Sequence, residues 1–135
     1  MAKSVQLDDI KKALVEISHK RNINSVVFHV NRERNYWIHI LRGGPTKEPF
    51  PGYYGEAICN TYLSEPWKLT DDQENLLIRL GWEAPEEEEQ SFFCYWKGET
   101  SAVHITIARQ VLETMTQVYG LVPEQMLDIE FENVL

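Results

Sequence analysis

The sequence predicts an α+β domain in which helices pack on one face of an antiparallel sheet. Some apolar runs repeat every second residue, as strands do, and others repeat every three or four residues, as helices do. Along the chain these runs give the order α-β-β-β-α-β-α-β, which suits a sheet covered by helices on one side. The chain has 135 residues and no linker-like segment, so we expect one domain over 1–135.

The first half of the chain predicts one helix and then a β-hairpin. Residues 5–19 place their apolar side chains on a single stripe, with charged residues between them. From Asn24 the period becomes two, and the polar run 31–35 separates two alternating segments, as in a hairpin. Three prolines and three glycines make 43–52 a loop, and Tyr53–Tyr62 is expected to form a third strand.

A second helix follows from local signals. Thr70 and Gln73 form a capping box, so the helix is expected to start at Asp71. Gly81 ends it in a left-handed conformation. We expect Trp82 to fold back on the helix as a core anchor, because apolar contacts accompany such caps.

The remaining elements are a strand, a long helix and a final strand. The acidic run 86–89 predicts a solvated surface loop, and the aromatic segment 91–96 predicts a buried strand. Thr100 or Ser101 begins the helix. The tail alternates between apolar and acidic residues over 127–131, which predicts a strand with one apolar face and one acidic face.

Composition limits the partners and the compartment. The net charge of −8 argues against binding to nucleic acid or to anionic lipid, both of which need clustered lysine and arginine. The N-terminus lacks the apolar stretch of a signal peptide, and no apolar run approaches membrane-spanning length. Two cysteines cannot make a disulfide framework. We therefore expect a cytoplasmic protein.

The hairpin strands predict two different sheet faces. The more apolar set should face the helices, because register follows burial. That set is Val26, Phe28, Val30, Tyr36, Ile38 and Ile40. The other face is too apolar for free solvation, so we expect a partner or a second copy of the chain there, with cover by a helix as the alternative. With the apolar face of the last strand, the predicted partner or dimer surface consists of Val27, His29, Trp37, His39, Leu41, Leu127, Ile129 and Phe131.

No set of residues points to catalysis, to a cofactor or to a metal. His29 and His39 could lie opposite each other on neighbouring strands, but the sequence fixes no third ligand. Cys59 and Cys94 fall in strands expected to be buried, where a thiol is inert packing. The segment 43–47 lacks the spacing of a phosphate-binding loop. We therefore predict no enzyme.

Two short motifs resemble a known family. Residues 56–63 read E-A-x-x-N-x-x-L, and residues 80–85 read L-G-W-x-x-P. With Tyr36-Trp37-Ile38 and the aromatic strand 92–96, they resemble the TY-Chap group of bacterial domains, which is related to type III secretion (Tir-type) chaperones and to YbjN-like proteins. The resemblance covers roughly residues 5–120, so the last strand is expected to be an extension of the family's pattern.

The resemblance implies a secretion-chaperone-like fold and a non-enzymatic chaperone-like or adaptor protein. Such a protein would form a homodimer and bind a segment of a protein partner, by strand addition to an open sheet edge or in shallow apolar grooves. The second hypothesis is a small-molecule-binding or sensory domain with a pocket between the sheet and the last helix. A cavity with convergent polar groups at that place would favour it.

Overall fold

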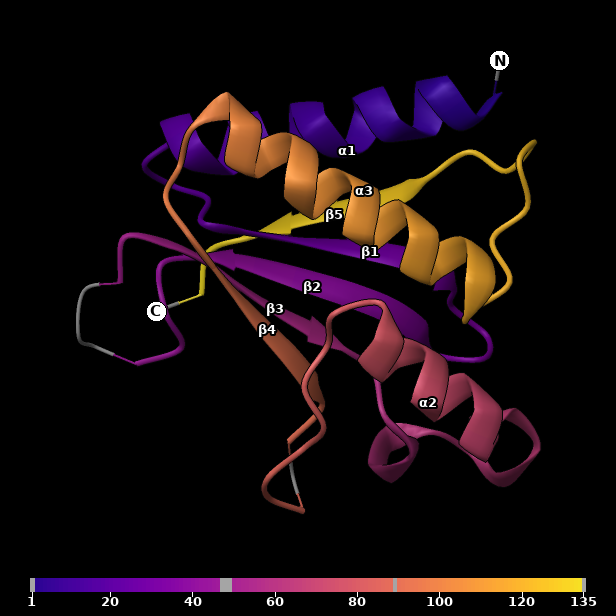
Figure 1. The fold of residues 1–135 in the computed structure, drawn as a ribbon. Helices are drawn as coiled ribbons and strands as arrows, with labels where there is room; N and C mark the ends of the chain where they lie inside the picture. The colour runs from indigo at the N-terminus through magenta and orange to yellow at the C-terminus, as the bar shows by residue number, and fades with distance from the viewer. Residues whose placement is uncertain (1, 47–49, 89, 135) are drawn as a thin grey trace.

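The computed structural model describes residues 2–46, 50–88 and 90–134 and confirms the predicted element order. Five antiparallel strands form one sheet. The helices are α1 (Ala2–His19), α2 (Asp71–Arg79) and α3 (Ser101–Gln117), and the strands are β1 (Ser25–Asn31), β2 (Tyr36–Arg42), β3 (Gly52–Ala57), β4 (Phe92–Lys97) and β5 (Asp128–Glu132). The strands lie in the order β4-β3-β2-β1-β5, so β4 and β5 are the two edges (Figure 1).

All three helices lie on the same side of the sheet. α1 and α3 lie side by side across this face (Figure 1), and the core forms between them and the strands. The hairpin residues predicted to face the helices are buried there as expected, with exposed fractions between 0% and 7%. None of the helices in the described part of the chain combines the length and apolarity that a bilayer crossing needs.

The third strand is shorter than the sequence predicts. β3 ends at Ala57, and the chain then forms two short 3-10 turns, at Asn60–Tyr62 and Glu65–Trp67. Asn60 holds the chain in this path, because its amide donates to the carbonyl of Leu69 at 3.0 Å and accepts from the Leu69 N–H at 2.6 Å. Cys59 therefore lies just after the strand and is buried outside it.

The caps of α2 are those predicted. Gln73 N–H donates to the Thr70 hydroxyl at 3.2 Å, and the Gln73 side chain accepts from the Thr70 N–H at 2.8 Å. Gly81 has φ of 108°, and the N–H groups of Gly81 and Trp82 return to the last turn of the helix. The Trp82 ring is 2% exposed and its N–H donates to the Thr114 hydroxyl of α3 at 2.8 Å, which confirms it as a core anchor.

β4 is an edge strand and is less buried than predicted. Phe92 and Trp96 point into the core, but Tyr95 is 46% exposed. Cys94 is half-buried, which corrects the expectation that both cysteines are fully buried. The acidic residues 86–88 are exposed, as expected of a surface loop, and position 89 lies outside the described residues.

The tail forms the second edge strand. β5 pairs antiparallel with β1, with Phe28 beside Ile129 and Val27 beside Glu130. The segment before it is fixed by Gln125, whose amide donates to the Val30 carbonyl at 2.7 Å. The first strand of the sheet is therefore flanked by β2 and by the last strand of the chain.

Candidate protein-binding surface

One face of the sheet carries no helix among the described residues. We call it the open sheet face, defined by the strand side chains that point away from α1 and α3. It contains five of the predicted surface residues, Val27, His29, Trp37, His39 and Leu41. The other strands add Tyr54, Glu56, Phe93, Tyr95, Asp128, Glu130 and Glu132. The alternative that a helix covers this face is wrong for the described residues.

The structure divides the eight predicted surface residues between two faces. Register places Ile129 beside Phe28 and Phe131 beside Val26, so the apolar residues of β5 share the helix-covered side. Leu127 and Ile129 pack against the core, while Phe131 is 40% exposed at the edge. The acidic residues of β5 join the open sheet face, which the sequence did not indicate.

A shallow groove lies on the open sheet face, with a volume of about 260 Å³. Val27 and Trp37 give it apolar surface, and Glu130 and Glu132 give it carboxylates. The lining residues are Val27, His29, Asn35, Trp37, His39, Glu130 and Glu132. The groove therefore combines an apolar floor with an acidic rim.

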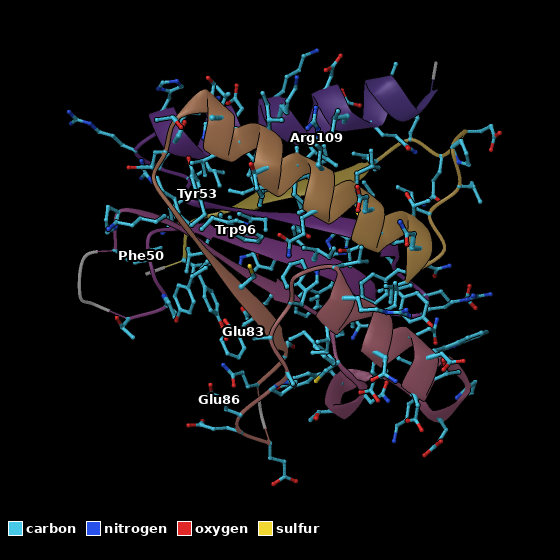
Figure 2. All side chains as sticks on the ribbon, in the orientation of Figure 1. Phe50, Tyr53, Glu83, Glu86, Trp96 and Arg109 are labelled. Atoms are coloured by element: carbon cyan, nitrogen blue, oxygen red, sulfur yellow. The ribbon has the colours of Figure 1, made fainter. Side chains whose placement is uncertain are left out.

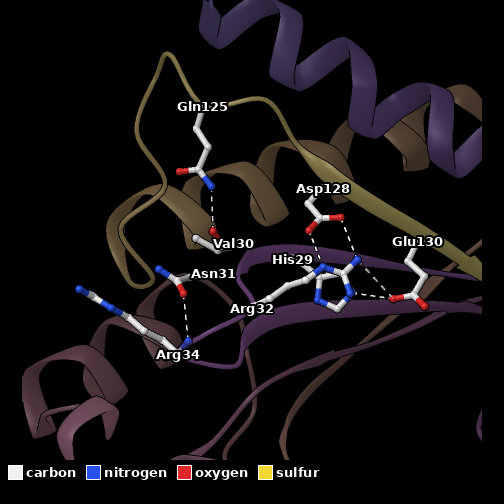
Figure 3. Close-up of polar contacts among 8 residues, drawn as sticks. All are labelled: His29, Val30, Asn31, Arg32, Arg34, Gln125, Asp128 and Glu130. Carbon is white, nitrogen blue, oxygen red and sulfur yellow. Dashed lines mark hydrogen bonds and ion pairs between the residues drawn. The ribbon is translucent and has the colours of Figure 1, made fainter.

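The two histidines bind carboxylates and not each other. His29 pairs with Trp37 on β2, and His39 pairs with Val27 on β1. The two rings therefore lie diagonally to each other, which corrects the expectation that they lie directly opposite. The Nε2 atom of His29 lies 2.8 Å from Glu130 Oε1 (Figure 3). The described residues contain no group of three or more His, Cys, Asp or Glu side chains placed to hold a metal ion.

Arg32 pairs with the first residue of the acidic strip, which we define as Asp128, Glu130 and Glu132 of β5. It extends from the β1–β2 loop and donates to both carboxylate oxygens of Asp128, at 2.6 and 2.9 Å (Figure 3). These hydrogen bonds lower the pKa of Asp128 and raise the pKa of Arg32. Glu130 lies 3.7 Å from the same guanidinium. The pair thus neutralises Asp128 and leaves Glu132 to face the groove.

The outer edge of β4 is a second exposed feature. Phe93 exchanges both of its backbone hydrogen bonds with Glu83, at 2.7 and 3.1 Å. Because bonding directions alternate along a strand, the N–H and C=O groups of Tyr95 and Lys97 also point outward. A groove of about 370 Å³ lies beside them between β4 and α3 and is lined in part by Trp96, which Figure 2 labels. No further strand pairs with the outer edge of β4 in the part of the chain that the structure describes, so an extended chain could add there.

Away from the groove beside β4, buried side chains fill the space between the sheet and α3. Two buried polar pairs lie there: the Tyr53 hydroxyl lies 2.7 Å from His104 Nε2, and the Tyr119 hydroxyl donates to the Ile58 carbonyl at 2.8 Å. Gln110 of α3 accepts from the Trp96 N–H, and its own Nε2 is buried without a hydrogen-bond partner among the described residues. Burial raises the pKa of Tyr53 to about 12 and lowers the pKa of His104. The two pairs lie inside one contiguous apolar core, so the described residues show no set of convergent polar groups there of the kind that a ligand pocket needs.

The thiols have the character of packing groups. Cys59 Sγ donates to the Gln90 carbonyl at 3.3 Å. Burial raises the pKa of Cys94, whereas a nucleophilic cysteine needs a lowered pKa.

Comparison with known proteins gives one assignment. No curated protein matches the chain significantly, and no solved structure does. Residues 27–132 match a family described as T3SS (YopN, CesT) and YbjN peptide-binding chaperone 3. The match confirms the resemblance seen in the sequence and extends through β5, so the last strand is part of the family's domain and not an addition to it. The chain belongs to the TY-Chap3 family of peptide-binding chaperones.

Proposed function

We propose that this protein is a non-enzymatic chaperone-like or adaptor protein that holds a segment of a partner protein on its open sheet face and along the outer edge of β4. The observation that carries the proposal is the uncovered sheet face, because a soluble domain seldom leaves such a mixed aromatic surface without a use. The family's description as peptide-binding chaperones supports it.

The outer edge of β4 offers the binding mode. An extended segment can add to β4 by hydrogen bonding to the outward N–H and C=O groups of Tyr95 and Lys97. Alternate side chains of such a segment point to opposite sides. One set would reach the groove beside α3, and the other would lie over Tyr95 and Phe50, whose rings pack at 5.3 Å.

The proposal also covers the compartment in which the protein works and the kinds of molecule that it binds. We place the protein in the bacterial cytoplasm, with a protein partner and with neither nucleic acid nor membrane as a ligand. The net charge of −8 supports the exclusion of both anionic surfaces.

We also propose that the chain forms a homodimer. If two copies meet through the open sheet face while no partner segment is bound, each buries the same patch, and about 800 Å² per copy is usual for a stable interface. The carboxylates of β5 then repel one another, so the dimer should strengthen with added salt. Light scattering at micromolar concentration tests this for the wild type and for Trp37→Glu. A monomeric wild type at low and high salt contradicts the dimer, and a dimer that survives Trp37→Glu moves the interface off this face.

The binding function is tested by capture from native cytosol. Bound segments are identified by cross-linking and mass spectrometry, synthesised, and titrated against the wild type and Tyr95→Glu. Val15→Glu is the matched control, because Val15 is 41% exposed on the opposite side of the molecule, on α1. We expect binding to fall in Tyr95→Glu and to persist in Val15→Glu. Equal binding by both variants would refute the β4 edge as the site.

A further inference from the structure

One row of residues crosses the middle of the open sheet face. Register places Glu130 beside Val27, Val27 beside His39, and His39 beside Glu56. Since neighbouring strands are about 4.8 Å apart, the two carboxylates stand at the ends of a row about 14 Å long. An aliphatic side chain and an imidazole ring lie between them.

Carboxylates outnumber cationic groups around this row. The carboxylates are those of Glu56, Asp128, Glu130 and Glu132. Within ion-pair distance of them, the described residues provide one guanidinium, Arg32, and no ammonium group. Arg32 is already held by Asp128 through two hydrogen bonds. The groove therefore keeps an excess of negative charge.

Glu132 is the carboxylate with the least internal compensation. Its nearest ionisable partner is His39 Nε2 at 4.0 Å, and its side chain is 44% exposed. The Nε2 atom of His39 is itself buried without a hydrogen-bond partner among the described residues. This side of the groove thus places a ring nitrogen without a hydrogen-bond partner beside a carboxylate whose ionisable partner is 4.0 Å away.

The floor of the groove suits the hydrocarbon part of a basic side chain. Val27 and Trp37 are half-buried and line it. The methylene groups of lysine and arginine pack on such apolar surface while the charged end stays near solvent. An indole face also attracts a cation within about 6 Å.

Building on the function proposed above, we propose that this groove binds a lysine or arginine side chain of the partner segment. Its charged end lies between Glu130 and Glu132, and its alkyl chain lies across Val27 and Trp37. Charge complementarity selects this occupant, since a second copy of the chain would bring a second acidic strip to the same place. The partner segment is therefore basic where it crosses β1 and β2.

Synthetic peptides test the proposal directly. Three fluorescent peptides of about nine residues carry lysine, glutamine or glutamate at every second position, with threonine and valine between. Fluorescence anisotropy gives their Kd for the wild type. We expect the lysine peptide to bind about five-fold more tightly than the glutamine peptide, as exposed ion pairs allow. The glutamate peptide should bind most weakly, and added salt should reduce these differences.

Two charge-neutralising variants locate the effect. Glu132→Gln should weaken binding of the lysine peptide about three-fold and leave the glutamine peptide unchanged. Glu113→Gln is the control. Glu113 is exposed on α3, so this substitution removes the same charge from the helix-covered side of the sheet. Circular dichroism melts verify that both variants fold like the wild type.

Each other outcome overturns the proposal. If lysine and glutamine peptides bind equally, the groove does not select a cation, although the chaperone function stands. An equal loss in Glu132→Gln and Glu113→Gln shows an effect of overall charge. If no peptide binds the wild type, the groove proposal fails, and the capture experiment above decides the chaperone function separately. If the lysine peptide binds only at protein concentrations at which light scattering shows the wild type to be monomeric, a second copy occupies this face.

Discussion

Gly55 of β3 packs closely against the Trp96 ring of the neighbouring strand β4, and Gly55→Ala tests what this contact contributes to stability. A Cβ atom at this position would stand 2.6 and 2.7 Å from Cζ3 and Cη2 of Trp96 and 3.1 Å from Cδ1 of Ile40. Carbon atoms pack at about 3.5–4.0 Å, so the Trp96 ring would have to move by about 1 Å.

Two effects of Gly55→Ala oppose each other. Alanine stabilises a strand relative to glycine by about 0.5–1 kcal/mol, because it loses less backbone freedom on folding. Overpacking costs about 1–3 kcal/mol. Trp96 resists displacement, since its N–H donates to Gln110 Oε1 at 3.1 Å and its ring packs edge-on against Trp82 at 5.8 Å. Overpacking therefore dominates, and we expect a net loss of about 1–2 kcal/mol and a fall in Tm of about 5 °C.

A double-mutant cycle with Trp96→Leu isolates the contact. Urea denaturation followed by far-ultraviolet circular dichroism gives the free energy of unfolding of all four proteins. In the Trp96→Leu background the ring is gone, so Gly55→Ala should be neutral or stabilising by up to about 1 kcal/mol. The same cost in both backgrounds would refute the reasoning, and so would a Gly55→Ala protein as stable as the wild type.

Four further predictions concern stability, thiols, pH and metal. Thr70→Ala should lower the free energy of unfolding by about 1 kcal/mol in urea titrations through the lost cap and leave peptide binding unchanged; changed binding at equal stability would place this helix end in a site. Neither Cys59 nor Cys94 should react with a thiol reagent within minutes at neutral pH, because Cys59 is buried and burial raises the pKa of Cys94. Cys94 is the more exposed of the two and should react first as the pH rises; rapid labelling at neutral pH would reopen catalysis. Burial raises the pKa values of Tyr53 and Tyr54 to about 12, above the usual 10, so the folded state retains protons that the unfolded state loses. The free energy of unfolding should therefore be at its full value below pH 10 and fall towards pH 12. Urea titrations, with tyrosinate absorbance followed in parallel, measure this. Chelator should leave Tm unchanged; a chelator-sensitive melt lost on histidine substitution would indicate a metal site.

The elements with local signals were predictable from the sequence. Thr70 and Gln73 meet within one turn, and Gly81 acts on the helix directly before it. The buried face of the hairpin follows from alternation over a few residues, so Phe28 and Ile38 were placed correctly. In each case the interacting residues lie close together in the chain, so the pattern itself carries the information.

The features that depend on pairing between distant segments were not predictable. Alternation shows that β5 has an apolar and an acidic side, but the register with β1 decides which side joins the open sheet face. That register places Glu130 beside Val27, so the acidic part of the candidate site was missed. The end of β3 likewise depends on the contact of Asn60 with Leu69.

The pairing of β5 with β1 also sets the order in which the molecule is completed during synthesis. Ser25 and Glu132 are 107 positions apart and yet adjacent in the sheet. Closing so long a loop costs little more free energy than closing a short one, but contacts between distant residues slow folding. A nascent chain therefore presents β1 as an unpaired edge until residues 128–132 emerge. The acidic side of the groove therefore forms only after these residues have emerged, and the basic segment proposed above would find its full site only from that point on.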